Sequence, residues 1–338
     1  MEEEKESMAE LKPQTKKKQN TRREKDKMDF LSELSDDVLL HIMHFMDTTT
    51  AVRTSLLSKR WNKVWKCLTT LCFKRSDFKT LDSYDQFVYH VVSKRDTSIS
   101  LHRLDLEACT VTQELLNHIT PLLHYVPNLS IYLDYFSPKE FYHSIPVIFS
   151  SPSLTSLTLS CTLGILKLPQ SLELPSLRTL NLTNVTFTAR DGDECAEPFS
   201  SCFLLNSLVL LGCSLSNPAK VLSISNPNLS RFTTIRYSEV KYKIVLSAPN
   251  LTHLDIRSSI ACHEVSSTCD FALLEEAVIE NSVCPLIVLR LLKMLSYVKI
   301  VTFSYPVTYY LFREPFLHTF RVPPDFSLIL FVLHESLS

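Results

Sequence analysis

Cysteine and histidine are the residue types in this chain with the clearest potential for catalysis or metal binding, and their spacing decides between these uses. The ten cysteines contain no Cys-x-x-Cys pair, so neither a zinc ribbon nor a thioredoxin-like site is predicted. The eleven histidines are scattered without ligand spacing. His41 and His44 fall on one predicted helix, but beside no carboxylate, and we expect them to face solvent. The sequence therefore predicts no metal and no cofactor.

The sequence also lacks the motifs that are typical of nucleotide-binding proteins and of hydrolases. None of the three glycines, Gly164, Gly192 and Gly212, lies in a phosphate-cradling loop or a dinucleotide fingerprint. There is no Gly-x-Ser-x-Gly elbow and no His-Glu-x-x-His helix. A cysteine-dependent hydrolase stays open as a hypothesis, because it needs only a thiol of depressed pKa beside a histidine, yet no local arrangement suggests one.

Composition points to a folded chain without a strong electrostatic preference. With 338 residues and 45% apolar content the chain can bury a sizeable core, enough for two or three domains. The formal net charge of −1 gives no basic field for nucleic acid or acidic membranes, so neither is expected as a partner.

The first 28 residues are charged and poor in apolar side chains, which predicts a disordered arm. The basic runs at 16–18 and 22–27 are either a nuclear-import signal or a solvated charge run. No apolar segment suggests a secretory signal, and the run Leu328 to Leu333 is too short to span a bilayer. We therefore expect the protein in the nucleus or cytoplasm.

A helical module is predicted next. Ser35 can cap a helix from about Asp36 to Met46, where two aspartates oppose the positive end of the helix dipole. A short second helix should cover 51–56, and a third should follow Ser58, with apolar residues at helical spacing up to Leu68. About 40 residues are too few to be very stable alone, so the module should dock onto a larger body.

The segments 34–42 and 56–65 resemble the F-box of plant F-box proteins, in which Leu-Pro usually stands where this chain has Leu34-Ser35. The resemblance implies a surface that binds a Skp-type adaptor and, through it, a cullin. Serine keeps the capping role but loses the rigid turn, so weaker adaptor binding is expected. The residues that should form or support this surface are Leu34, Ser35, Val38, Leu39, Ile42, Leu57, Trp61 and Trp65.

A repeated pattern fills the rest of the chain. The template Leu-x-x-Leu-x-Leu begins at positions 101, 129, 154, 177, 205, 229, 251, 274 and 298, at steps of 22 to 28 residues. Apolar residues fill all three template positions except in the units at Leu129 and Leu229, which fail at Asp134 and Thr234. A near-constant step of this length is typical of leucine-rich repeats, in which each unit contributes one short strand with inward leucines.

This half resembles the repeats of plant F-box/leucine-rich-repeat proteins, many of which end in a further domain that is not recognisable here. The expected fold class is α/β: a small three-helix F-box followed by an α/β leucine-rich-repeat solenoid. The expected divisions are an arm at 1–28, an F-box at 29–70, a linker or first irregular repeat at 71–100, repeats at 101–304 and a divergent tail at 305–338.

The resemblance implies a non-catalytic subunit of a ubiquitin ligase that holds a protein target near the ubiquitin-loaded enzyme. The alternative is a repeat scaffold without ligase association, suggested by Ser35. Because side chains alternate across a strand, the positions between the leucines should form a polar, concave, target-binding strip, basic in its middle and acidic toward its end. Its candidate contact residues are Arg178, Asn181, Arg231, His253, Asp255 and Glu275. The target itself cannot be identified from the sequence.

Overall fold

The structure is a computed structural model of the 338-residue chain. It describes residues 30–108, 113–135, 148–163, 166–237, 242–258, 264–281, 295, 298, 300–304 and 331–333. The charged arm, Cys109 and most of the predicted C-terminal tail lie outside these residues.

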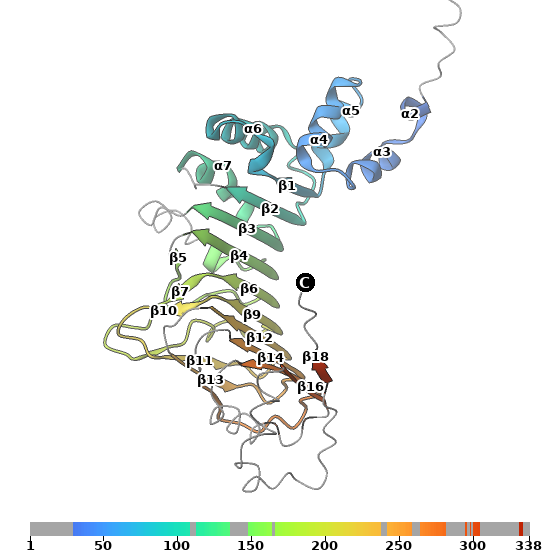
Figure 1. The fold of residues 1–338 in the computed structure, drawn as a ribbon. Helices are drawn as coiled ribbons and strands as arrows, with labels where there is room; N and C mark the ends of the chain where they lie inside the picture. The colour runs from blue at the N-terminus through green and yellow to red at the C-terminus, as the bar shows by residue number, and fades with distance from the viewer. Residues whose placement is uncertain are drawn as a thin grey trace, which may run out of the picture.

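Short helices form the N-terminal module (Figure 1). They are α2 (Phe30–Glu33), α3 (Asp36–Met43), α4 (Thr48–Arg53), the 3-10 turn η1 (Thr54–Leu56), α5 (Trp61–Val64) and the 3-10 turn η2 (Trp65–Cys67). Ser35 caps α3 by accepting from the Val38 N–H, and Asp47 caps α4 by accepting from the Thr50 N–H. The first and third predicted segments are helical but shorter than expected, whereas the second, expected over 51–56, already begins at Thr48. Helix α2 is an additional turn. The count of three helices is not confirmed.

Within the described residues, eleven parallel strands form one continuous sheet, in the order β1-β2-β3-β4-β6-β9-β12-β14-β16-β17-β18. Figure 1 shows them stacked as a ladder that leads away from the N-terminal module. Their bounds are β1 (Thr70–Phe73), β2 (Arg103–Ala108), β3 (Asn128–Tyr135), β4 (Ser156–Leu163), β6 (Thr179–Thr183), β9 (Ser207–Leu211), β12 (Arg231–Arg236), β14 (His253–Ser258), β16 (Glu276–Asn281), β17 (Ile300–Ser304) and β18 (Phe331–Leu333).

The template leucines line one face of this sheet. Leu157, Leu180, Leu208 and Phe232 are aligned across consecutive strands and are all buried. Each contributes apolar area to a single hydrophobic core that runs from the N-terminal module to Val301. A parallel-strand solenoid is therefore the architecture of the repeat region, as the pattern predicted.

One predicted unit was placed in the wrong register. Leu129 was taken as the first template position, but the structure pairs it with Leu104, which is the second. The first position belongs to Val126, which is buried, whereas Tyr132 points to the other side and is exposed. The unit therefore reads Val126-x-x-Leu129-x-Ile131, with all three positions apolar and no failure at Asp134. The unit at Leu229 is in the expected register, and its Thr234 is buried.

A further unit precedes the predicted ones. Leu68, Leu71 and Phe73 are buried, and β1 pairs Leu71 with Leu104 and Phe73 with Leu106. The sheet therefore begins at the end of the N-terminal module. The Cys72 N–H donates to Thr48 Oγ1 at 2.7 Å, which fastens helix α4 to β1. The expected docking of the small module onto a larger body is thus direct.

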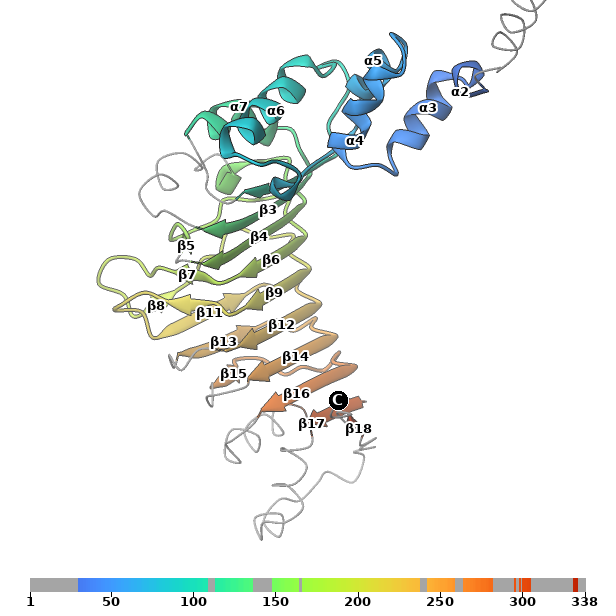
Figure 2. The ribbon, with the colours of Figure 1, turned by 45° about the horizontal axis from the view of Figure 1, so that its top comes forward.

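The buried face of the sheet is covered differently along the chain (Figure 2). Helices α6 (Leu81–Lys94) and α7 (Gln113–Leu123) follow β1 and β2, with η3 (Arg75–Asp77) before α6 and η4 (Ile148–Ser150) before β4. Later units carry short parallel strands instead. These are β5 (Leu166–Lys167), β7 (Val185–Phe187) and β10 (Ser214–Leu215) in one sheet, and β8 (Cys195–Ala196), β11 (Val221–Ser225), β13 (Lys243–Ser247) and β15 (Val265–Ser267) in another. We call the opposite side of the long sheet its open face.

Polar side chains link successive turns just before the strands. Asn250 Nδ2 donates to the Pro227 carbonyl at 2.8 Å, and Asn228 Nδ2 donates to the Phe203 carbonyl at 2.7 Å. In the turn before β4, the Ser153 hydroxyl makes an equivalent bond by donating to the His124 carbonyl. These bonds satisfy carbonyl groups that the turns leave without a backbone partner. The recurring Pro-Asn-Leu sequence at 227–229 and 249–251 is thus structural.

Two aligned turns after the strands need a left-handed backbone. Asn184 has φ 54° and Gly212 has φ 61°, at the ends of the paired strands β6 and β9. A Cβ at Gly212 would lie 2.2 Å from Asn184 Oδ1. The Asn184 side chain cannot swing away freely, because its Nδ2 donates to the Cys161 carbonyl at 2.8 Å.

We expect Gly212→Ala to lower the free energy of unfolding by about 1–3 kcal/mol, from backbone strain and the displaced asparagine together. Urea denaturation followed by circular dichroism measures the change. Gly192→Ala is the matched control, since Gly192 also has a positive φ of 85° but no atom within 4 Å of the added Cβ. An equal loss in both variants would show that the Asn184 contact contributes nothing.

Candidate functional site

Helix α3 presents an apolar face to solvent. Val38, Ile42 and Phe45 recur at helical spacing on or just after this helix, so they lie on one side of it. Val38 is 43% exposed and Phe45 is 80% exposed, with the Phe45 ring packed edge-on against His41 at 5.0 Å. A large apolar side chain this exposed contributes no core packing and is available to a partner.

A second exposed apolar group lies at the end of η1, before helix α5. Leu56 is 87% exposed and Leu57 is 65% exposed. Arg60 Nε donates to Asp36 Oδ1 at 2.6 Å, so the chain that leads into α5 is tied to the start of α3. We define the apolar patch as the exposed large apolar residues of this module: Leu31, Val38, Phe45, Leu56 and Leu57.

The predicted adaptor-binding residues divide into two groups by burial. Val38, Leu57 and Ser35 are exposed, and Leu34 and Ile42 are half-buried. Leu39, Trp61 and Trp65 are buried in the core of the module. Trp65 also donates its indole N–H to Asn62 Oδ1 at 3.2 Å. The two tryptophans and Leu39 can therefore support the surface but cannot form it.

Sequence reasoning missed the two most exposed members of the patch, Phe45 and Leu56. Phe45 was read as part of a helix that is apolar on more than one face, and Leu56 as the end of a short helix. The width of the apolar face of the first helix was the available signal, because it exceeds what a surface helix needs.

The target-binding candidates all lie on or at the edge of the open face. Arg231, His253 and Glu276 follow one another across β12, β14 and β16, and Asn181 and Asp255 lie one pleat further along their strands. Arg178 and Glu275 are exposed in the turns that lead into β6 and β16. The alternation of side chains along the strands puts Asn181, Arg231, His253 and Asp255 on the open face. Arg178 and Glu275 lie in turns before their strands, so this alternation does not place their side chains.

The charges on the far part of the open face are largely paired. Arg257 donates from Nε to Asp255 Oδ1 at 2.9 Å and from Nη2 to Asp255 Oδ2 at 3.0 Å. These hydrogen bonds raise the pKa of the Arg257 guanidinium. Arg257 Nη1 also lies 3.8 Å from Glu280 Oε2, and His253 Nε2 lies 3.8 Å from Glu276 Oε2. The predicted acidic end is therefore partly neutralised by Arg257, which lies one position beyond the template.

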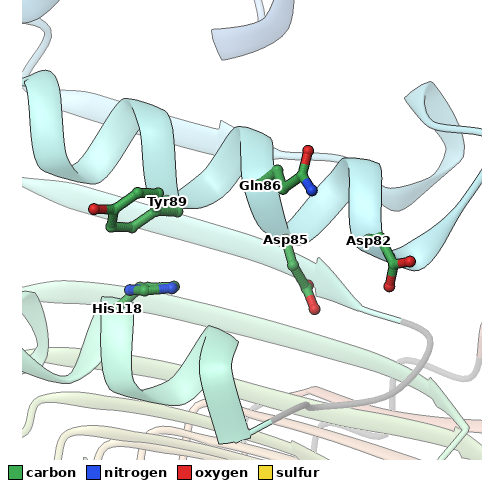
Figure 3. Close-up of a pocket in the computed structure, with 5 residues that line it drawn as sticks. All are labelled: Asp82, Asp85, Gln86, Tyr89 and His118. Carbon is green, nitrogen blue, oxygen red and sulfur yellow. The ribbon is translucent and has the colours of Figure 1, made fainter.

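A pocket of about 280 Å³ lies between helices α6 and α7. Figure 3 shows Tyr89 of α6 facing His118 of α7, with Asp82, Asp85 and Gln86 along the rim on α6. The two rings lie 4.4 Å apart and join the helices. Because the pocket is open and polar, it does not resemble an enclosed ligand site.

Five of the described cysteines have pKa values shifted away from what nucleophilic catalysis needs. Burial raises the pKa of Cys202 to about 11 and that of Cys213 to about 12. Burial also raises the pKa of Cys67, Cys72 and Cys195. A thiol nucleophile needs the opposite shift, because only the thiolate attacks. These five residues therefore give the hydrolase hypothesis no support.

Within the described ranges, no group of three or more histidine, cysteine or acidic residues is arranged to hold a metal ion. In that same part of the chain, none of the helices combines the length and apolarity that a membrane span requires.

Comparison with known proteins matches both halves of this architecture. Residues 31–72 match the family model of the F-box domain, and residues 120–273 match the model described as "FBD-associated F-box protein At5g56370, LRR repeats". Neither model describes an enzyme family. No solved structure matches the chain.

Curated relatives come from Arabidopsis thaliana. The "Putative F-box/FBD/LRR-repeat protein At5g56810" is 31% identical over 245 residues, which are 68% of this chain and 53% of that protein. The "Putative F-box/FBD/LRR-repeat protein At3g49040" is 32% identical over 243 residues, 68% of this chain and 55% of that protein. The "FBD-associated F-box protein At4g10400" is 28% identical over 240 residues, 66% and 54% of the two chains. This chain thus spans about half the length of these relatives.

A helical module with an exposed apolar patch, continuous with a solenoid of parallel strands, defines a chain built from modules that bind other proteins. The matched domains and relatives make the assignment more specific. The chain belongs to the plant F-box/leucine-rich-repeat proteins.

Proposed function

We propose that this chain is the substrate-recognition subunit of a Skp–cullin–F-box type ubiquitin ligase. The observation that supports this most is the apolar patch, because it lies within the residues that match the F-box and is exposed in the isolated chain. In this proposal the three helical segments of the F-box bind a Skp-type adaptor, which connects the chain to a cullin. The repeats bind a protein target on the open face.

The proposed role requires no catalytic residue in this chain. A bound target is held close to the ubiquitin-loaded enzyme, so that its lysines meet the reactive thioester at high effective concentration. The contribution of the chain is therefore binding and orientation. The solenoid suits this role because it offers a long, continuous surface on a rigid frame.

Co-purification of the full chain with a Skp-type adaptor tests the proposal. We expect a stable complex on size-exclusion chromatography, and a ternary complex when a cullin is added. A folded chain that forms no complex with the adaptor would contradict the proposal and favour the scaffold without ligase association. A ubiquitin-transfer or hydrolase activity of the purified chain alone would contradict the non-catalytic role.

Ser35 is the observation that favours the scaffold alternative, and it allows a specific prediction. Its backbone has φ −64°, which proline adopts without strain. We therefore expect Ser35→Pro to leave the module folded and to strengthen adaptor binding several-fold, because the turn before α3 becomes rigid. The lost cap opposes this by up to about 1 kcal/mol of helix stability. Isothermal titration calorimetry with the adaptor measures the effect.

Ser35→Ala is the matched control, since it removes the cap without stiffening the turn. If neither the native chain nor the Ser35→Pro variant binds the adaptor while both remain folded, the scaffold alternative becomes the better account.

A further inference from the structure

The turns that lead into the strands lie along one edge of the long sheet, because the strands are parallel (Figure 2). Seven neighbouring strands, from β3 to β16, share one register, and their paired, buried residues are Leu129, Leu157, Leu180, Leu208, Phe232, Leu254 and Ala277. Four or five residues before these paired residues, each of the seven turns exposes an apolar side chain. We define the apolar rim as Tyr125, Pro152, Pro175, Phe203, Leu204, Pro227, Pro249 and Leu273.

Three residues of the apolar rim are not required by the fold. In other turns, the side chain four residues before the paired residue donates to a carbonyl of the preceding turn, as do Ser153, Asn228 and Asn250. The turns before β3, β9 and β16 have Tyr125, Leu204 and Leu273 at this place, and these are 80%, 42% and 54% exposed. Leucine cannot donate such a bond, and large apolar side chains this exposed are available to a partner.

The apolar rim is symmetric about the turn that contains Phe203. This turn precedes β9, which has three of the seven strands on either side. The first and second turns on each side expose proline, and the third exposes a large apolar side chain, Tyr125 on one side and Leu273 on the other. Three steps of about 4.8 Å place these two turns about 14 Å from the centre. A two-fold axis through the Phe203 turn therefore maps proline onto proline and Tyr125 onto Leu273.

A two-fold dimer needs a surface that is complementary to itself, because each residue meets the residue to which the axis maps it. We propose that the apolar rim binds a second copy of this chain in an antiparallel, two-fold arrangement. Phe203 of both copies lies at the axis, and Tyr125 of each copy packs against Leu273 of the other. The two N-terminal modules then lie at opposite ends of the dimer, and the apolar patch of each is outside the contact. The inference does not depend on the proposed function.

The size of the apolar rim predicts a weak dimer. Each turn contributes one or two residues, so the contact belongs to the small class of interfaces, below about 1,200 Å² in total, and we expect a dissociation constant on the order of 10 µM. The rim residues carry no charge. Arg178 and Arg231 belong to the units on either side of Phe203, so the axis brings each toward the other in the second copy. Because salt screens this repulsion, the dimer should strengthen as salt rises.

Sedimentation equilibrium of the full chain, at concentrations that span the expected dissociation constant, tests the proposal. The mass of the native chain should rise from that of a monomer to that of a dimer. Phe203→Glu should weaken the dimer at least tenfold, because two carboxylates meet at the axis. Tyr89→Glu is the matched control, since Tyr89 is 52% exposed but lies on helix α6, away from the apolar rim. This control should dimerise as the native chain does.

Leu204→Asn separates loss of contact from loss of folding. It introduces the residue type that Asn228 and Asn250 have at the same place, where each donates to a carbonyl of the preceding turn. We therefore expect this variant to keep at least the native free energy of unfolding in urea, while its dimer is about tenfold weaker.

Two complementary variants test the antiparallel geometry. Tyr125→Glu and Leu273→Lys should each weaken the dimer when alone, because a charge then faces an apolar residue at both ends of the contact. When the two variants are mixed, one end of the mixed dimer has glutamate against lysine and the other keeps tyrosine against leucine. The mixed dimer should therefore be several-fold tighter than either variant alone. Sedimentation with one variant fluorescently labelled measures this difference.

Three results would overturn the inference. The first is a native chain that stays monomeric at every concentration. The second is an equal effect of Phe203→Glu and Tyr89→Glu on the dimer. The third is a mixed dimer no tighter than those of the separate variants, since the two ends of the rim would then not meet. Adaptor co-purification is measured separately, so none of these results bears on the proposed function.

Discussion

A chain that carries both Phe45→Glu and Leu57→Glu should remain folded and lose at least about 100-fold in affinity for a Skp-type adaptor. The two side chains are 80% and 65% exposed, so glutamate at either position stays solvated in the free chain. In the complex each carboxylate would be buried against an apolar partner without a compensating charge. A loss of about 2.8 kcal/mol in binding free energy corresponds to the 100-fold change. Surface plasmon resonance with immobilised adaptor measures it.

Phe203→Glu is the matched control for this experiment. Phe203 is an aromatic residue that is 65% exposed, as Leu57 is, but it lies in the turn before β9, far along the solenoid from the N-terminal module (Figure 1). The control should bind the adaptor as the native chain does. Undiminished binding by the Phe45/Leu57 double variant would mean that the apolar patch is not the adaptor surface.

Leu39→Asp should also abolish adaptor binding, but through unfolding of the N-terminal module. Leu39 is fully buried on α3, so aspartate would place an unpaired carboxylate in the core. Such a substitution costs about 4 kcal/mol or more, which is comparable to the whole stability of a small module. We expect rapid proteolysis between residues 30 and 68, while the strands beyond β1 stay protected. Limited proteolysis with mass spectrometry locates the cleavage sites.

Leu39→Met separates the effect of charge from the effect of shape, since methionine has a similar volume and keeps the core apolar. This variant should resist proteolysis and bind the adaptor. If Leu39→Asp is as resistant to protease as the native chain and still fails to bind, then Leu39 contacts the adaptor and the placement of the surface must be revised.

The repeat architecture was predictable because it depends on a pattern that recurs many times. Inward leucines at three positions per unit are required for each strand to bury its face, so the spacing identified the strands and which side chains face outward. The register error at Leu129 arose because Leu129 and Leu101 both fit a first position when read one unit at a time. Only the pairing of Leu129 with Leu104 shows that Val126 fills the first position.

Other features depend on contacts that sequence spacing does not reveal. The pairing of Arg257 with Asp255 and Glu280 joins residues of β14 to a neighbouring strand, so the acidic end of the open face was overestimated. The unit at Leu68 did not fit the template, because it lies 33 residues before Leu101, beyond the usual step, and is separated from it by helix α6; residues 71–100 were therefore left open as a linker or a first irregular repeat. Within the N-terminal module, periodicity identified the apolar residues but not which of them the core leaves exposed.

The buried face of the long sheet is covered first by helices and then by short strands, and this change affects the direction of the solenoid. Packed helices lie about 8–10 Å apart, whereas neighbouring strands lie about 4.8 Å apart. Units whose buried face is covered by α6 and α7 are therefore wedge-shaped, wider on the helix side than on the open face, and they curve the solenoid. Units backed by β11, β13 and β15 have equal spacing on both sides and add length with little bending (Figure 2). Gain or loss of a unit covered by a short strand would thus shift the position of a bound target by about 4.8 Å. The same change in a unit covered by a helix would also change the orientation of the target.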